Sequence, residues 1–153
     1  MNQKSEDEQF MRRCIVLGQM AREQGDSPVG ALLAKDGRIA AEGIEAGRSR
    51  KDITYHAEIE AIRALIQQTG DTDLSGYTLY TTHEPCIMCS YVIRHHKIAR
   101  IVWGISTGAI GGYSSDYKLL KDTVLEKWGA PPEIVAGVLE ADCRLLHQEN
   151  KLK

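Results

Sequence analysis

The chain has 153 residues, of which 42% are hydrophobic and 26% are charged, and its formal net charge is −2 at pH 7. This length and balance suit one domain spanning residues 1–153, and they exclude a membrane protein because no apolar run approaches the roughly 18 residues that a membrane helix needs. The acidic balance also disfavours a nucleic-acid partner, since nucleic acids are normally bound by clustered Lys and Arg.

Hydrophobic spacing and turn residues predict alternating helices and strands. The turn signal Asp36-Gly37 should join the first two strands into a hairpin. An initial hairpin followed by helices that alternate with strands predicts an α/β fold, a three-layer α/β/α sandwich around a mixed sheet of about five strands. In chain order we expect a helix at 6–24, strands at 29–35 and 38–44, a helix from 56 to about 69, a strand at 77–82, a helix from 85, a strand at 99–105, a short helix at 118–125, a strand at 133–138 and a last helix at 139–149.

The four cysteines indicate a reducing environment. The N-terminal residues are polar and charged, and no apolar stretch follows them, so we expect no secretory signal. Without export, four Cys predict free thiols and a cytoplasmic location. Cys14 and Cys143 each stand alone on an apolar helical face, where a buried and inert thiol is expected.

Two short runs carry the chemistry: His56-Ala57-Glu58 and Pro85-Cys86-Ile87-Met88-Cys89. His56, Cys86 and Cys89 can supply three zinc ligands. A structural zinc normally takes four protein ligands, whereas a catalytic zinc takes three and keeps a position for water. Glu58, two residues from His56, is then placed to move protons as a general acid and base.

Two other interpretations of the Cys pair are weaker. A structural zinc knuckle could combine Cys86 and Cys89 with His95 and His96, but it leaves the His-Ala-Glu run without a purpose and lacks a second Cys pair. A redox Cys-x-x-Cys motif would need a thioredoxin-type context, which is missing. We expect no catalytic role for His95, His96 or His147.

These motifs resemble the cytidine deaminase-like superfamily of zinc deaminases. The resemblance also covers Pro28-Val29-Gly30-Ala31, Leu79-Tyr80 and Val102-Trp103-Gly104. It is strongest toward the branch that holds tRNA adenosine deaminases, guanine deaminases and fungal-type cytosine deaminase.

The resemblance implies a Zn²⁺-dependent hydrolytic deaminase that releases ammonia from an amino-bearing N-heterocycle. It implies that Glu58 shuttles protons and that the backbone N–H of Cys86 helps hold the developing oxygen charge. It further implies a homodimer in which a neighbouring subunit completes the pocket.

The substrate hypothesis depends mainly on Glu45. The resembling families place an Asn after a Gly on the strand before the zinc His, whereas this chain reads Gly43-Ile44-Glu45. An ionised Glu only accepts hydrogen bonds, so it favours an amino-rich small molecule such as a guanine-like base or an amino-triazine. The alternative is that Glu45 turns to solvent beside Arg48 or Arg50.

The C-terminal end lacks the basic helix with paired aromatic residues that is typical of bacterial tRNA adenosine deaminases. A nucleobase or nucleoside deaminase is therefore the main hypothesis. A tRNA-specific adenosine deaminase is the alternative, and a non-catalytic zinc-binding protein of the same fold is the second alternative.

Further substrate contacts are predicted around the metal site. The loop from Tyr113 to Tyr117 should cover the pocket, with Tyr113 packing on the substrate and Asp116 accepting from it. The alternative is a surface turn in which Asp116 caps the following helix. His83 should line the pocket or support a ligand, and Val29 and Ala57 complete the predicted set.

Two basic clusters qualify the acidic composition. They are either solvated surface charge or a contact for phosphate. One comprises Arg48, Arg50 and Lys51, and the other Arg94, His95, His96, Lys97 and Arg100.

Overall fold

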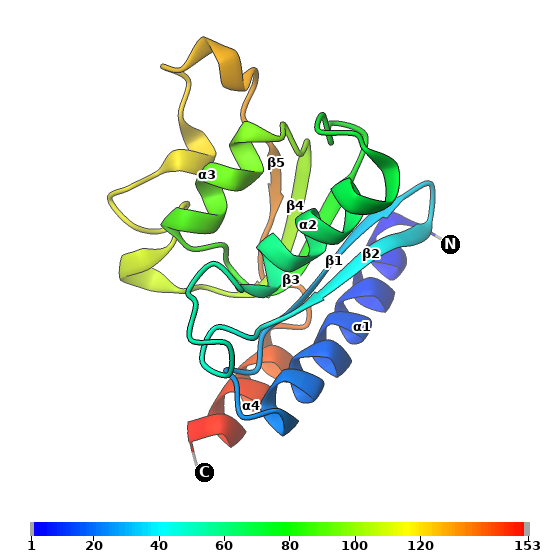
Figure 1. The fold of residues 1–153 in the computed structure, drawn as a ribbon, viewed down its shortest axis with the longest axis vertical. Coiled ribbons are helices and arrows are strands. Elements are labelled where there is room, and N and C mark those ends of the chain that lie inside the picture. The colour runs from blue at the N-terminus through cyan, green and yellow to red at the C-terminus, as the bar shows by residue number, and fades with distance from the viewer. Residues whose placement is uncertain (1, 152–153) are drawn as a thin grey trace.

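A computed structural model describes residues 2–151. Four α-helices, three short 3-10 turns and five strands form a three-layer sandwich, as predicted (Figure 1). In chain order the elements are α1 (Gln3–Glu23), β1 (Gly30–Lys35), β2 (Arg38–Ile44), α2 (Ala57–Thr69), β3 (Thr78–His83), α3 (Ile87–His95), β4 (Arg100–Ile105), η1 (Gly108–Ile110), η2 (Leu119–Lys121), η3 (Glu126–Trp128), β5 (Glu133–Val135) and α4 (Glu140–Lys151).

The sheet is mixed and has the strand order β2-β1-β3-β4-β5. The hairpin of β1 and β2 turns at Asp36 and Gly37, whose φ angles of 53° and 74° match a two-residue turn with left-handed backbone. β3 runs antiparallel to β1, and β4 and β5 continue parallel to β3.

The strand directions gather four chain segments at one edge of the sheet. The carboxyl ends of β3 and β4 lie there because these strands are parallel. The start of β1 and the end of β2 lie there as well, since Gly30 pairs with Ile44 and Ala31 pairs with Thr81. Ligand sites of α/β sheets commonly form at such carboxyl edges.

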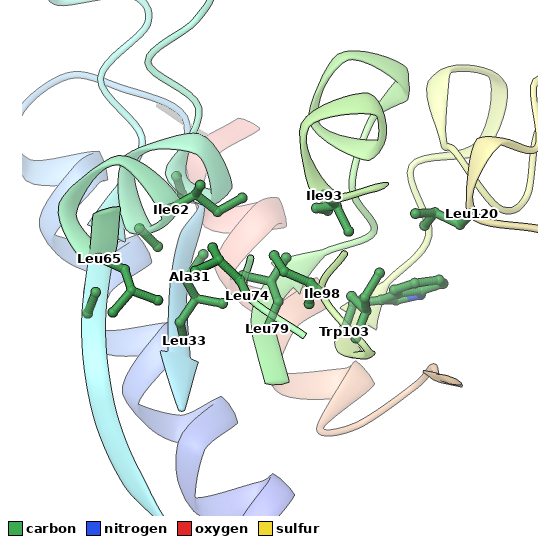
Figure 2. Close-up of a cluster of buried hydrophobic side chains, with 14 residues drawn as sticks. Ala31, Leu33, Ile62, Leu65, Leu74, Leu79, Ile93, Ile98, Trp103 and Leu120 are labelled. Carbon is green, nitrogen blue, oxygen red and sulfur yellow. The ribbon is translucent and has the colours of Figure 1, made fainter. Parts of the chain in front are cut away.

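Helices cover both faces of the sheet, with α2 and α3 on one side and α1 and α4 on the other (Figure 1). Leu33, Ile62, Leu79 and Ile93 belong to the buried cluster between the sheet and α2 and α3 (Figure 2). A second cluster lies under α1 and α4 and includes Cys14 and Cys143, which are both fully buried as expected.

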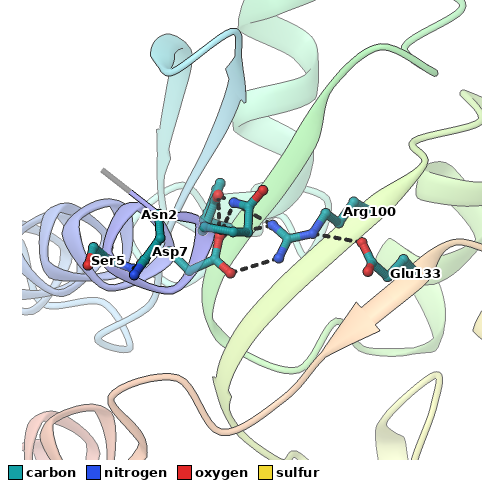
Figure 3. Close-up of polar contacts among 7 residues, drawn as sticks. Asn2, Ser5, Asp7, Arg100 and Glu133 are labelled. Atoms are coloured by element: carbon teal, nitrogen blue, oxygen red, sulfur yellow. Dashed lines mark hydrogen bonds and ion pairs between the residues drawn. The ribbon is translucent and has the colours of Figure 1, made fainter.

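A buried ionic contact ties α1 to the sheet. Arg100 at the start of β4 donates to both carboxylate oxygens of Asp7, at 2.9 and 2.7 Å, and its Nε donates to Glu133 on β5 at 2.8 Å (Figure 3). Tyr80 donates to the same Asp7 at 2.6 Å. Because Asp7 is only 4% exposed, this network fixes the N-terminal half of α1 on the strands.

Two sequence predictions were wrong in the C-terminal third. The helix expected at 118–125 is absent, and the only helical element in that segment is the 3-10 turn η2, which the 3-10 turn η3 follows at Glu126–Trp128. The strand expected at 133–138 is limited to Glu133–Val135. The other predicted elements are present with their ends shifted by a few residues.

Candidate active site

Three potential metal ligands meet between the first turns of α2 and α3. His56 is the N-cap residue of α2 and Cys86 that of α3, while Cys89 lies in the first turn of α3. The Nδ1 atom of His56 is 3.5 Å from Sγ of Cys86 and 3.4 Å from Sγ of Cys89. The structure thus brings the three predicted ligands to one point.

This triangle has the dimensions of a zinc site. Zinc binds thiolate sulfur at about 2.3 Å and imidazole nitrogen at about 2.0–2.1 Å, so tetrahedral angles place such ligand atoms about 3.6 Å apart. The two observed nitrogen–sulfur distances, 3.5 and 3.4 Å, agree with that value. Among the described residues, this is the only group of three or more His, Cys, Asp and Glu side chains that could share an ion.

The electrostatics of the two cysteines also favour a cation. The hydrogen bond with Cys89 lowers the pKa of the Cys86 thiol to about 4, whereas the same contact and burial raise the pKa of Cys89 well above its ordinary value. The two pKa values diverge because a thiolate on one sulfur opposes ionisation of its neighbour. A divalent cation between them removes that opposition, so both can serve as thiolate ligands.

Glu58 lies in the first turn of α2 and is only 4% exposed. It lines the same cavity as His56 and Cys86. Burial raises the pKa of Glu58 to about 8, so the group can hold or release a proton near neutral pH.

The cavity has a volume of about 230 Å³ and opens at the carboxyl edge of the sheet. Most of its lining comes from the segments that flank the strand ends, and α2, α3 and α4 supply the remainder. The lining residues are Ser27, Pro28, Val29, Glu45, His56, Glu58, His83, Glu84, Cys86, Thr107, Ile110 and His147.

Glu45 lies in the wall of this cavity, 9% exposed, as the substrate-contact interpretation requires. Its carboxylate accepts from the backbone N–H of Gly47 at 3.2 Å. Burial raises the pKa of Glu45, while the charge of His56 and the backbone N–H groups of Gly47 and Ala57 act in the opposite direction. Ala57 is fully buried and is not among the residues that line the cavity, so a role for it in substrate binding stays a prediction.

His83 closes β3 and lines the cavity together with His147 of α4. The Nε2 atom of His83 is 3.4 Å from Nδ1 of His147, and Thr82 contacts Nδ1 of His83 at 2.8 Å. Burial and the neighbouring His147 lower the pKa of His83 to about 4, which keeps its imidazole neutral. We expected no catalytic role for His147, and no spacing in the sequence indicates that it lines this cavity, because only the tertiary fold brings α4 to this edge.

Tyr113 and Asp116 lie outside the cavity lining. The ring of Tyr113 packs on Trp103 with its centroid 5.4 Å away. Asp116 is exposed, and the N-cap residue of η2 is Lys118, which makes no side-chain cap hydrogen bond, so the structure does not have the capping alternative either. A role for either residue in substrate binding stays a prediction.

Glu84 is a site residue that sequence reasoning missed. It is 1% exposed and lines the cavity between His83 and Cys86. Burial alone would raise the pKa of Glu84, but hydrogen bonds from Ser114, Tyr113 and Ser106 outweigh burial and lower it. Glu84 is therefore a buried, ionised group.

The two basic clusters differ, since Arg48, Arg50 and Lys51 are exposed while Arg94 is buried within the fold. Arg94 is 1% exposed and donates to the carbonyl of Leu119 at 2.6 Å, so it is no surface cation. The guanidinium group of Arg50 lies over the ring of Tyr55, 4.7 Å from its centroid, and Arg63, which belongs to neither cluster, lies 4.9 Å from the same centroid. No helix in the part of the chain that the structure describes is both long and apolar enough to span a membrane.

Comparison with known proteins identifies relatives along most of the chain. The family described as the cytidine and deoxycytidylate deaminase zinc-binding region matches residues 4–105. A tRNA-specific adenosine deaminase of Haemophilus influenzae is 39% identical over 144 residues, which cover 90% of this chain and 78% of the relative. The tRNA-specific adenosine deaminase of Streptococcus pyogenes serotype M1 is 31% identical over 139 residues, covering 91% of this chain and 80% of the relative.

Solved structures of deaminases are also similar to this chain. A structure from work on A-to-I editing by tRNA:A34 deaminases at the wobble position superposes with a TM-score of 0.83 and 30% identity, over 90% of this chain and 98% of that one. A guanine deaminase of Bacillus subtilis superposes with a TM-score of 0.64 and 31% identity, over 86% and 83% of the two chains. The chain therefore belongs to the cytidine and deoxycytidylate deaminase zinc-binding family and is a zinc-dependent deaminase.

Proposed function

We propose that residues 1–153 act as one deaminase domain that hydrolyses an exocyclic amino group of a nucleobase and releases ammonia. The observation that carries this proposal is the ligand triangle of His56, Cys86 and Cys89 at the wall of a base-sized cavity, with the buried Glu58 beside it. Zinc at that triangle supplies a Lewis acid that activates water.

Glu58 carries the protons of the reaction. Its carboxylate accepts a proton from the attacking water and delivers it to the ring nitrogen next to the amino-bearing carbon. A further proton transfer through Glu58 lets the amino group leave as ammonia. In balance, one water is consumed, the carbon–nitrogen bond breaks and a carbon–oxygen double bond forms. The backbone N–H of Cys86 is the donor we assign to the developing oxygen charge.

Adenosine in tRNA is the first substrate to test. Support comes from relatives named as tRNA-specific adenosine deaminases, which are similar to this chain over about nine tenths of its length. This support runs against the prediction from net charge, which disfavoured nucleic acid. Composition reports only the sum over the surface, and Arg48 and Arg50 stand in the loop just before His56, so a local contact with phosphate is compatible with a total of −2.

A guanine-like free base is the second candidate, and Glu45 is the observation that favours it. A carboxylate in the cavity wall prefers a substrate edge that presents N–H groups, as guanine does at its amino group and N1. The lone pairs of adenine N3 and N7 would meet an ionised Glu45 unfavourably, unless Glu45 holds a proton. The 31% identity with the Bacillus subtilis guanine deaminase supports including this substrate.

The experiment compares turnover of the candidate substrates in separate reactions. Zinc-loaded protein is incubated with an anticodon stem-loop that carries adenosine at the wobble position, and separately with guanine, cytosine, adenine and an amino-triazine. Inosine is measured by mass spectrometry and ammonia by a coupled assay. We expect turnover of the stem-loop to exceed that of every free base. Turnover of guanine without inosine formation would replace the first candidate with the second.

Two variants of Glu45 refine the result. Glu45→Asn installs the residue of the resembling families, and Glu45→Gln removes the charge at nearly constant shape. If Glu45 contacts the base, both variants must change the ranking of substrates. A protein that binds zinc yet turns over none of these compounds would refute the deaminase proposal and leave a non-catalytic zinc protein. A homodimer stays a prediction, to be measured by sedimentation.

A further inference from the structure

Glu84 occupies an unusual position for a buried carboxylate. It follows β3 directly and is separated from the ligand Cys86 by Pro85 alone, yet only 1% of its surface is exposed. The five hydrogen bonds that its carboxylate accepts come from uncharged donors, and all of them belong to the loop between residues 106 and 114.

The carboxylate holds both ends of this loop. At one end, Oε1 accepts from the hydroxyl of Ser106 at 2.9 Å and from the backbone N–H of Thr107 at 3.3 Å. At the other end, Oε2 accepts from the backbone N–H groups of Tyr113 at 3.0 Å and Ser114 at 2.8 Å, and the hydroxyl of Ser114 donates to Oε1 at 2.8 Å. In addition, the hydroxyl of Thr107 donates to the backbone carbonyl of Glu84 at 3.2 Å.

The loop in turn contacts the ligand segment. Gly111 pairs with Cys86 as an isolated antiparallel bridge, and the N–H of Gly112 donates to the carbonyl of Pro85 at 2.9 Å. The packing is tight, because a Cβ atom on Gly111 would lie 2.1 Å from Oε2 of Glu84. The same loop contributes Thr107 and Ile110 to the cavity lining.

We propose that Glu84 is a positioning residue of the active site. By holding the 106–114 loop against Pro85 and Cys86, it fixes the direction of the Cys86 ligand and the cavity wall formed by Thr107 and Ile110. A carboxylate suits this task because it accepts from several N–H and O–H groups at once, which an amide cannot do without turning its own N–H₂ toward donors. For its activity readout, this inference rests on the proposed deaminase function.

The test compares Glu84→Gln with Asp7→Asn. Asp7 is a matched control, since it is also a buried and multiply hydrogen-bonded carboxylate, but it lies at the opposite end of β4 from the metal site. Both variants should lower the melting temperature. In Glu84→Gln we also expect zinc affinity, measured by competition with a chelating dye, and kcat to fall by about 10- to 100-fold, as is typical when a residue that supports a ligand is changed.

The spectrum of the cobalt-substituted protein separates positioning from stability, and it needs no substrate. Cobalt(II) bands report the ligand geometry directly, so we expect Glu84→Gln to shift them while Asp7→Asn leaves them as in the wild type. A Glu84→Gln protein with lowered melting temperature but wild-type cobalt bands and zinc affinity would overturn the inference.

A milder variant keeps the test decisive if Glu84→Gln fails to fold. Ser114→Ala removes one of the five bonds and leaves the backbone donors in place. We expect a smaller shift of the cobalt bands in the same direction, and an unchanged spectrum would overturn the inference. If the wild type turned over no substrate, the proposed function would fail, while the cobalt spectrum and zinc affinity would still decide the role of Glu84.

Discussion

The close approach of β2 and α2 at Gly43 should make Gly43→Ala damaging to both stability and catalysis. A Cβ atom at this position would lie 2.1 Å from the carbonyl oxygen of Ala57 and 2.6 Å from the backbone nitrogen of Ala61. Both atoms belong to the backbone of α2, so no side-chain rotation can relieve the overlap. An ordinary contact needs about 3.4 Å, and α2 must therefore move away from the sheet by about 1.3 Å.

This displacement reaches the active site because α2 carries Glu58 in its first turn and His56 as its N-cap. Overpacking of this kind costs about 1–3 kcal/mol, which lowers the melting temperature of a domain of this size by roughly 2–12 °C. A misplacement of about 1 Å costs on the order of 10²-fold in rate. We therefore expect kcat/KM to fall by about two orders of magnitude in a protein that still folds.

The assay pairs calorimetry with ammonia release on the best substrate. Gly76→Ala is the control, since a Cβ there meets only the flexible end of Lys35 at 3.3 Å, and it should change neither quantity appreciably. A Gly43→Ala protein with wild-type melting temperature and kcat/KM would refute the link between this contact and the position of the catalytic groups.

Four further predictions concern single groups. Cys86→Ala should lose zinc and activity together, which elemental analysis and ammonia release will check; full zinc in this variant would remove Cys86 from the ligand set. Glu58→Gln should keep zinc and fold but lose about 10²–10⁴-fold in kcat, so turnover within tenfold of wild type would exclude its role as proton shuttle. The pKa of His83 is lowered to about 4, so between about pH 6.5 and 4 its imidazole is protonated in the unfolded chain but stays neutral in the folded chain. The free energy of unfolding should therefore fall as the pH is lowered over that interval. Urea titrations of His83→Leu should show a weaker fall. Burial acts to raise the pKa of Asp7, but hydrogen bonds from Arg100 and Tyr80 outweigh burial and lower the pKa. The ionised Asp7 therefore stabilises the fold above about pH 4, and this stabilisation is lost only below that pH. Asp7→Asn should make the free energy of unfolding less dependent on pH in the acid range.

Much of the fold could be predicted because its signals are local. The turn at Asp36 and Gly37 needs two adjacent residues, and the end of α2 is marked by Gly70, whose φ of 75° is the left-handed cap that Gly adopts readily. The three potential metal ligands that the structure brings together were equally easy to predict, since Cys86 and Cys89 are three residues apart and His56 is two residues from Glu58. A short motif reports chemistry without any knowledge of the tertiary fold.

The remaining parts of the site depend on contacts between distant segments. Glu84 finds its partners 22–30 residues further along the chain, and no spacing in the sequence indicates that a loop will close around it. His147 reaches the cavity only because α4 packs near the end of β4. The prediction for Tyr113 and Asp116 used the composition of their loop. In the structure the carboxylate of Glu84 accepts a hydrogen bond from the backbone N–H of Tyr113, and the ring of Tyr113 packs on Trp103.

The missing helix at 118–125 has a similar physical origin. The apolar residues of this segment have helical spacing. However, the carboxylate of Asp122 accepts hydrogen bonds from the backbone N–H groups of Val124 and Leu125, both at 3.1 Å. These bonds stabilise a turn in place of the backbone hydrogen bonds of a helix. The buried Arg94 of α3 then donates to the carbonyls of Leu119 and Gly129, at 2.6 and 3.3 Å. A charged donor supplied by another helix thus satisfies the carbonyl of Leu119, which a local helix would have used. Tertiary hydrogen bonding overrides the local pattern here, as it does around Glu84, and both segments border α3, which carries the proposed zinc ligand Cys89.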